Sequence, residues 1–124
     1  MIFLDTHIVV WLYAGLTEKL SNKAIEAIEN NDIVISQMVR LELQYLFEIG
    51  RITVPAVDII TSMNGAIGLT IHTMPVDKVF SQALEQTWTR DVFDRIITSE
   101  AMMVDSVLIT KDKTILANYN KAVW

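Results

Sequence analysis

The chain has 124 residues, a length that fits one domain over residues 1–124 with a sizeable core. Hydrophobic residues make up 52% of it and charged residues 20%, and the mean hydropathy of +0.35 is high for a protein whose surface faces water. The apolar surplus indicates a surface buried between two copies or against a partner, with a generous core as the alternative reading.

The sequence contains no cysteine, which excludes a disulfide framework and a thiolate metal site. Its longest apolar run, Ile8–Leu16, is shorter than the roughly 20 residues that span a bilayer. No basic segment precedes the first apolar stretch, as it does in a signal peptide. We therefore expect a cytoplasmic protein with no membrane partner.

The formal net charge of −5 is opposite to that of most nucleic-acid binders. Without the four acids discussed below, however, 11 of the 15 acidic residues remain, against 10 Lys and Arg. Two divalent ions at those four acids would cancel their charge. The charge thus argues against a broad, non-specific grip on nucleic acid but leaves an RNA substrate open.

Short β-branched runs alternate with helical patterns along the whole chain. The expected strands are Ile2–Asp5, Ile33–Ser36, Leu69–His72 and Val107–Thr110. The expected helices are Ser21–Glu29, Gln37–Ile49, Pro55–Asn64, Asp77–Trp88 and Asp91–Val104. This alternation predicts a three-layer α/β/α domain with a mostly parallel central sheet.

Turn and cap residues set the expected ends of these helices. Ser21 is a plausible N-cap, Gly50 ends the second helix, and Asn64-Gly65 is expected to end the third. In parallel sheets, ligands bind beyond the carboxyl ends of the strands. Asp5 and Asp112 both follow expected strands, so we expect them to meet at that edge.

Asp5 taken alone has an ordinary alternative role. A single aspartate after a strand is usually a turn residue or a helix N-cap. Thr6 comes next and could cap the following helix instead, which would leave Asp5 free for other chemistry.

Glu42 lies on the apolar side of its predicted helix. Gln37, Arg40, Gln44 and Glu48 form a polar stripe at spacings of three and four. Glu42 projects roughly 200° away from Arg40 on a wheel of 3.6 residues per turn. A carboxylate on that side must be paired, protonated or bound to a metal ion, and a snorkelling or Arg-paired glutamate is the alternative.

The remaining acids also have ordinary readings. Asp91 and Asp94 fall in the first turn of a helix, where the macrodipole favours acids, and Asp91 suits a capping role. Asp94 adjoins an apolar stripe and can face inward. Asp112 sits in Thr-Lys-Asp-Lys, a turn by composition. Glu100 falls within the same apolar stripe as Asp94, and it suggests a supporting hydrogen bond to the site.

Together, the four acids indicate a cation site. Two carboxylates about 4 Å apart repel by roughly 4 kcal/mol at an effective dielectric near 20. A fold that gathers four must raise their pKa values or bind cations. His7 and His72 lack zinc-site spacing, and oxygen-only ligands suit Mg²⁺ or Mn²⁺.

These motifs resemble a PIN domain, specifically a VapC-type ribonuclease toxin, over nearly the whole chain. Phe-Leu-Asp-Thr-His is similar to the family's first acidic motif and Leu-Glu-Leu to the second. Asp-Val-Phe-Asp-Arg-Ile-Ile resembles the third, although Val92 stands where proline is usual, and Leu-Ile-Thr-Lys-Asp resembles the last. The resemblance assigns the metal-binding and catalytic roles to Asp5, Glu42, Asp94 and Asp112, with Thr6, Asp91 and Thr110 as accessory residues.

The resemblance implies an endoribonuclease that needs Mg²⁺ or Mn²⁺ and is opposed by a cognate antitoxin. A metal-activated water is the expected nucleophile, because the motifs supply no good His or Lys to act as a general base. Asp5 and Asp94 are expected as bridging ligands, with Glu42 and Asp112 ligating or orienting water. Arg90, Arg95 and Lys111 lie close in sequence to these acids and are candidates for RNA-phosphate contacts, with a solvated charge as the alternative for each.

Other functions remain open from the sequence. One alternative is a PIN-related nuclease that acts on DNA or in RNA maturation without an antitoxin. Another is a non-catalytic acidic module that binds metal or phosphate, although only Asp5 follows the first strand where such modules carry a pair. The apolar helices 37–49 and 55–64 are candidates for a homodimer contact and an antitoxin groove.

Overall fold

The computed structural model describes residues 1–124 and contains one sheet of five strands. The strands are β1 (Ile2–Leu4), β2 (Ile33–Ile35), β3 (Thr70–Ile71), β4 (Leu108–Ile109) and β5 (Ala122–Val123). They follow the order β3-β2-β1-β4-β5, and every neighbouring pair is parallel. The predicted α/β class with a parallel sheet is confirmed.

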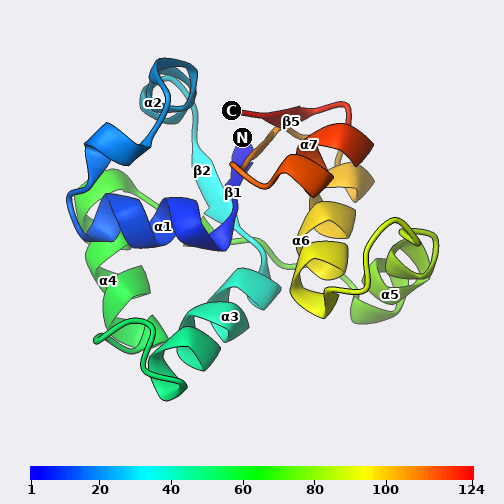
Figure 1. The fold of residues 1–124 in the computed structure, drawn as a ribbon, viewed down its shortest axis with the longest axis horizontal. Helices are drawn as coiled ribbons and strands as arrows, with labels where there is room; N and C mark the ends of the chain where they lie inside the picture. The colour runs from blue at the N-terminus through cyan, green and yellow to red at the C-terminus, as the bar shows by residue number, and fades with distance from the viewer.

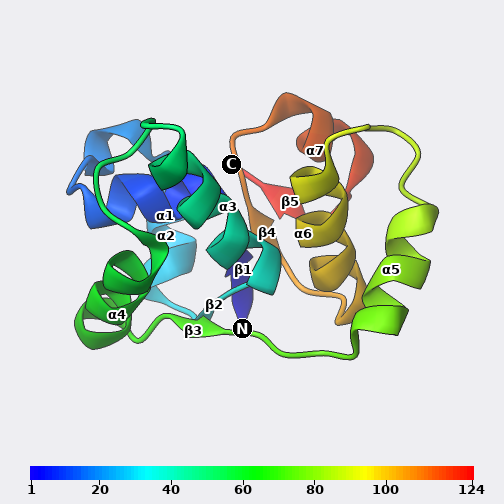
Figure 2. The ribbon, with the colours of Figure 1, turned by 90° about the horizontal axis from the view of Figure 1, so that it is seen from below.

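Seven α-helices surround the sheet (Figure 1). They are α1 (Thr6–Tyr13), α2 (Asn22–Glu29), α3 (Gln37–Glu48), α4 (Ala56–Ile67), α5 (Val76–Leu84), α6 (Val92–Met103) and α7 (Lys113–Asn118), with a 3₁₀ turn at Thr17–Lys19. Seen from below, α1, α2 and α4 lie on one side of the strands and α5, α6 and α7 on the other (Figure 2). None of these helices has the length and apolar character required to cross a membrane.

The inner strands form the centre of the hydrophobic core. Phe3, Leu4, Ile35, Leu108 and Ile109 are fully buried, as expected for strands covered on both faces. Each run is rich in β-branched or other large apolar side chains, which suit a pleated and buried surface. This core fixes the strands in one register and so fixes the positions of the residues that follow them.

Three predicted helix features differ in the structure. Helix α4 continues through Asn64-Gly65 to Ile67 and ends at Gly68, whose φ of 70° is left-handed. Helix α5 ends at Leu84 rather than Trp88. The segment around Asp112, expected as a turn, begins the short helix α7. Ser21 caps α2 as predicted, accepting a hydrogen bond from the Ala24 amide at 3.0 Å.

The carboxyl edge of the sheet collects the first residues of several helices. Asp5, Ser36 and Asp112 are the N-caps of α1, α3 and α7 and follow β1, β2 and β4. Helix α6 also begins at this edge, because its far end leads to Ser106, whose hydroxyl donates to the Met1 carbonyl at the opposite edge. The fold therefore brings four helix starts to one place.

Candidate active site

A cavity of about 290 Å³ lies where these helices begin. All four acids singled out in the sequence line it, and so does the accessory Asp91. The full lining comprises Asp5, His7, Ile8, Trp11, Glu42, Asp91, Asp94, Lys111 and Asp112. The structure thus gathers acids that lie up to 107 positions apart in the sequence, since Asp5 and Asp112 share one cavity.

The Asp5 carboxylate is held from two sides. The Thr6 amide donates to Oδ1 at 2.8 Å, and the Thr110 hydroxyl donates to Oδ2 at 2.6 Å. Burial raises the pKa of Asp5 above its ordinary value, while the hydrogen bonds from Thr110 and Thr6 partly offset that rise. Of the two residues considered for the cap of the following helix, Asp5 is the N-cap of α1, and Thr6 is the first residue of that helix.

Thr6 contacts the second acid instead. Its hydroxyl is fully buried and donates to Oε1 of Glu42, across 36 positions of sequence. Burial raises the pKa of Glu42 to about 7, and the nearby charges of Asp5 and Asp91 add to the rise. The helical wheel placed Glu42 off the polar stripe of α3, and its half-buried position at the cavity agrees with that placement.

The pKa of Asp94 is raised further above its ordinary value than that of Glu42. Burial raises the pKa of Asp94 to about 8, and the charges of Asp91, Asp5, Asp112 and Glu42 contribute in that order. Its backbone amide donates to Oδ1 of Asp91 at 3.0 Å, so Asp91 caps α6 and also lines the cavity. The carboxylate of Asp94 is left free to take a cationic partner.

Asp112 combines a structural role with its place in the cavity. Its Oδ1 accepts from the amides of Thr114 at 2.8 Å and Ile115 at 3.0 Å, which fixes the start of α7. The Asp112 amide donates to the Thr110 hydroxyl oxygen at 3.0 Å. Because the same hydroxyl donates to Asp5, Thr110 connects the two outermost acids of the sequence.

The chemistry of the cavity fits a hard divalent cation. Its five carboxylates supply only oxygen donors, and the pKa values of Glu42 and Asp94 are raised first by burial and then by the neighbouring acids. No three of the chain's His, Asp or Glu side chains are arranged around a single point that could hold a metal ion. In Asp5, Glu42 and Asp112, at least one carboxylate oxygen instead accepts a hydrogen bond from a protein group.

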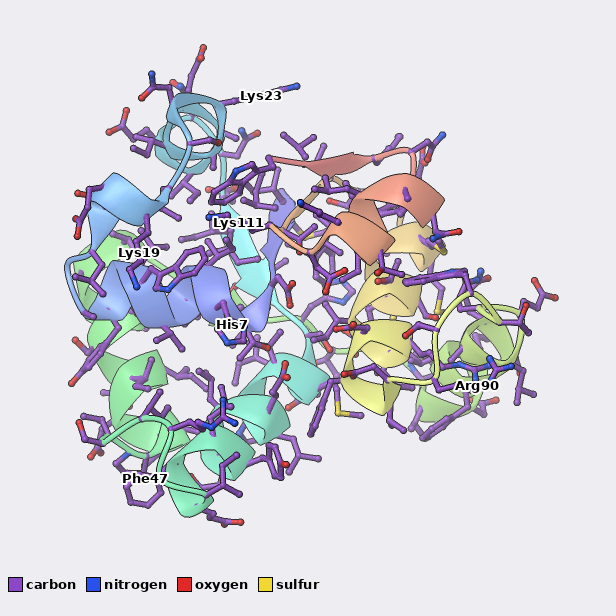
Figure 3. All side chains as sticks on the ribbon, viewed as in Figure 1. His7, Lys19, Lys23, Phe47, Arg90 and Lys111 are labelled. Atoms are coloured by element: carbon purple, nitrogen blue, oxygen red, sulfur yellow. The ribbon has the colours of Figure 1, made fainter.

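The three candidate cations have different surroundings. Lys111 lines the cavity. The Arg95 guanidinium instead donates to the Ala83 carbonyl at 2.9 Å and 3.2 Å, at the end of α5. Arg90 donates to the Thr87 carbonyl at 2.9 Å, and its side chain lies beside α5 (Figure 3). Of the three, only Lys111 has a position next to the acids.

His7 and Trp11 line the cavity, although neither was predicted from the sequence to be a ligand or a catalytic residue. Both lie on α1, four positions apart, and therefore on one face of the helix. The spacing itself is the signal that was missed: α1 begins directly after Asp5, so a face that starts at His7 must adjoin that acid.

Glu100 lies outside this site. It lines a separate cavity of about 280 Å³ between α3, α5 and α6, and its exposed fraction is 4%. Its Oε1 accepts from the Ser36 hydroxyl at 3.0 Å, while Oε2 has no partner. Burial raises the pKa of Glu100 above its ordinary value. Because Ser36 caps α3, Glu100 supports the helix that carries Glu42 without touching the acids.

Comparison with known proteins agrees with this geometry. No curated protein matches the sequence. A solved toxin-antitoxin complex from Klebsiella pneumoniae contains a chain with 18% identity and a TM-score of 0.68, with 100% of this chain and 97% of that chain covered. VapBC2 from Rickettsia felis, solved with a DNA fragment from its promoter, gives 20% identity and a TM-score of 0.70, with 100% and 98% covered. These likenesses show the same fold.

The family itself follows from a match along the sequence. A family model for the PIN domain matches residues 2–121, which include strands β1 to β4 and all of the acids in the cavity. The chain belongs to the PIN domain family.

Proposed function

We propose that the protein is a Mg²⁺- or Mn²⁺-dependent endoribonuclease that acts as the toxin of a toxin–antitoxin pair. The observation that carries the proposal is the single cavity lined by five carboxylates at the carboxyl edge of a PIN fold. Such a cavity repels an RNA phosphate placed at the acids unless a cation is present, so metal binding and the binding of that one phosphate are coupled in this proposal.

Asp5 and Asp94 are the proposed bridging ligands, with Glu42 and Asp112 ligating or orienting water. When bound, the ion supplies Lewis acidity toward the scissile phosphate and lowers the pKa of an attacking water. Thr110 and Thr6 hold the carboxylates of Asp5 and Glu42 in fixed orientations, which limits the reorganisation needed on binding. Lys111 is the cation placed to contact a phosphate beside the acids.

The antitoxin part of the proposal is supported by what the two solved structures are. Both are described as complexes of a toxin with its antitoxin, and each likeness covers the full length of this chain. The chain also exposes large apolar side chains on α3 and α4, where Leu41 and Val57 are 57% and 67% exposed. A cavity of about 380 Å³ lies between these two helices and gives an apolar segment of a partner a place to bind.

A homodimer is part of the same proposal. Phe80, Leu84 and Val92 are exposed on α5 and α6, opposite α4 in Figure 2, and add a second apolar surface. Light scattering of the purified protein at micromolar concentration is expected to give twice the mass of one chain. The mass of a single chain would exclude this part of the proposal.

The nuclease activity is tested by incubating the purified protein with a fluorescently labelled single-stranded RNA in Mg²⁺, in Mn²⁺ and in EDTA. We expect cleavage only with the ions. Asp94→Asn is expected to lower the rate by roughly 100-fold or more, since several kcal/mol of transition-state stabilisation depend on the ion and its ligands.

Asp77→Asn is the matched control, because Asp77 is an exposed acid in the first turn of α5 and lies outside the cavity. It should cleave at the wild-type rate. Equal rates for the Asp94 and Asp77 variants, or full cleavage in EDTA, would contradict the assignment of this site.

A further inference from the structure

Beside the acidic cavity, five side chains form a cluster, of which the proposed chemistry uses only Lys111. We define it as the aromatic–lysine rim: His7 and Trp11 of α1, Lys19 of the following turn, Lys111 after β4, and Trp124 after β5. His7, Trp11 and Lys111 line the cavity as well, so the rim is continuous with the acids. Figure 3 shows His7 at the start of α1, with Lys19 and Lys111 near the same helix.

The aromatic rings of the rim pack at steep angles to one another, and both indoles also pack against the hydrophobic core. The Trp11 and Trp124 centroids are 6.2 Å apart at 61°, and the His7 and Trp11 centroids are 6.2 Å apart at 51°. His7 is exposed and both indoles are half-buried. Tilted, partly exposed rings leave part of a π-face available for another planar group.

The two lysines lie against these rings. The Lys111 ammonium is 5.8 Å from the Trp11 centroid and 5.6 Å from the Trp124 centroid, and the Lys19 ammonium is 5.8 Å from the Trp11 centroid. Such cation–π contacts are weak at exposed positions. They hold the ammonium groups close to the rings while leaving their hydrogen-bonding capacity unused.

Neither lysine is neutralised by a carboxylate. The chain's one ion pair within 4.0 Å joins Lys121 to Asp105 and involves neither lysine of the rim. Lys111 shares its cavity with five acids and still forms no ion pair with any of them. Two ammonium groups without an ion pair beside half-buried indoles can bind a nucleotide, with the phosphate on the cation and the base on the ring once a lysine side chain has moved from over it.

We propose that the aromatic–lysine rim is a nucleotide subsite for single-stranded RNA, in which Trp11 stacks on an unpaired base and Lys111 binds the phosphate next to it. This inference rests on the proposed function, because it places that nucleotide beside the phosphate held at the acids. The strand must be unpaired, since a base inside a duplex does not expose its face. Stacking accepts any base, so the subsite selects the single-stranded state more than the sequence.

Lys19 extends the subsite away from the acids and can contact a second phosphate. The chain is acidic overall, and Arg90 and Arg95, the other two cations close in sequence to the acids, donate instead to backbone carbonyls near α5. RNA binding should therefore depend on few cations. Removing one phosphate contact should reduce the slope of log affinity against log salt by about 0.7 for a single strand.

Binding is measured apart from cleavage. Protein carrying Asp94→Asn is titrated in EDTA into a fluorescein-labelled single-stranded RNA of mixed sequence, and into the same RNA as a duplex, with anisotropy as the readout. We expect the single strand to bind more tightly. Adding Trp11→Leu should weaken single-strand binding about tenfold, the usual effect of losing one base–aromatic stack. Trp11→Phe, which keeps a ring, should restore most of it.

Lys111→Gln in the same background should weaken binding and lower the salt slope. Lys78→Gln is its matched control, because Lys78 is exposed on α5, away from the rim. Thermal unfolding by circular dichroism checks that each variant folds. Equal binding by the Trp11→Leu and parent proteins, or equal binding of single strand and duplex, would overturn the subsite.

The outcome separates the two proposals. If the wild-type protein cleaves RNA with metal while the Trp11→Leu and Lys111→Gln variants bind and cleave normally, the subsite is wrong and the nuclease remains. If the wild-type protein cleaves no RNA, the nuclease proposal fails. The EDTA titration then still decides whether the rim binds single-stranded RNA.

Discussion

Thr110 is the residue on which the geometry of the acids depends most. Its fully buried hydroxyl accepts from the Asp112 amide and donates to Oδ2 of Asp5, so one side chain sets the separation of two acids. The preceding strand is buried and Thr110 has no freedom to move with its partners. The hydrogen bond from Thr110 therefore orients the Asp5 carboxylate before a metal ion binds.

Replacing Thr110 by valine keeps the shape of the side chain and removes the hydroxyl. We expect the rate of RNA cleavage to fall about tenfold, because a hydrogen bond to a charged group is worth on the order of 1.5–3 kcal/mol and part of it orients Asp5. The pKa of Asp5 should rise further without this donor. Thr110→Ser retains the hydroxyl and should keep most of the activity; if it behaves like valine, the methyl group and not the hydrogen bond is what matters.

The raised pKa values of Glu42 and Asp94 make a prediction about stability without metal. A carboxyl whose pKa is higher in the folded than in the unfolded protein favours folding below its unfolded pKa, and this stability is lost as the pH rises through the folded pKa. The pH window runs from the ordinary pKa values of 4.5 for Glu42 and 3.8 for Asp94 up to about 7 and about 8.

Thermal unfolding in EDTA should therefore show a falling melting temperature between about pH 5 and pH 8. The double variant Glu42→Gln, Asp94→Asn should flatten that dependence, and added Mn²⁺ should stabilise the wild type most at the high end of the range. A melting temperature that rises with pH over this window would show that the acids are not crowded as described.

At the scale of the elements, the sequence predicted strands better than helix ends. Strands β1, β2 and β4 are recognisable because their residues are apolar and β-branched on both faces, whereas β5 is two half-buried residues with no pattern to detect. Helix α5 ends four residues early because Arg95, from a different helix, donates to the carbonyls of Ala83 and Leu84. A helix end that is capped by a residue 11 or 12 positions away cannot be recognised from the sequence around that end.

The candidate site was likewise predictable from the sequence only in part. The positions of the four acids were predictable, because strand ends and helix starts meet at one edge of a parallel sheet. Their roles as caps and cavity residues are not exclusive, as Asp5 and Asp112 show. The rim was not predictable, because Lys111, Trp11 and Trp124 come together only through the pairing of β4 with β1 and β5.

The end of α4 gives a direct test at this scale. Gly65 lies inside the helix and Gly68 follows it with a φ of 70°, and a Cβ at either position would meet no atom within 4 Å. Gly65→Ala should stabilise the protein by about 0.5–1 kcal/mol through helix propensity. Gly68→Ala should destabilise it by about 1 kcal/mol, because alanine disfavours the left-handed conformation. Urea unfolding of both variants measures the difference, and the reverse order would place the helix end at Asn64-Gly65.

At the scale of the whole molecule, charge is concentrated where function is proposed. The chain carries 15 acids and 10 Lys and Arg, and five of the acids line one cavity. The remaining surface is close to neutral and has exposed apolar patches on α3, α4, α5 and α6. A near-neutral, apolar surface suits protein partners, and a local acidic cavity with a basic aromatic rim suits a bound ion and a single strand of RNA.

The most direct test of this account is calorimetric titration of the metal-free protein with Mn²⁺ at pH 8, in parallel for the wild type, Asp94→Asn and Asp77→Asn. We predict saturable binding to the wild type and the Asp77 variant, and a loss of affinity of at least about tenfold in the Asp94 variant, where one oxygen ligand is replaced by a neutral amide. If the wild type takes up no Mn²⁺, or if all three proteins bind it equally well, the acids do not form a metal site.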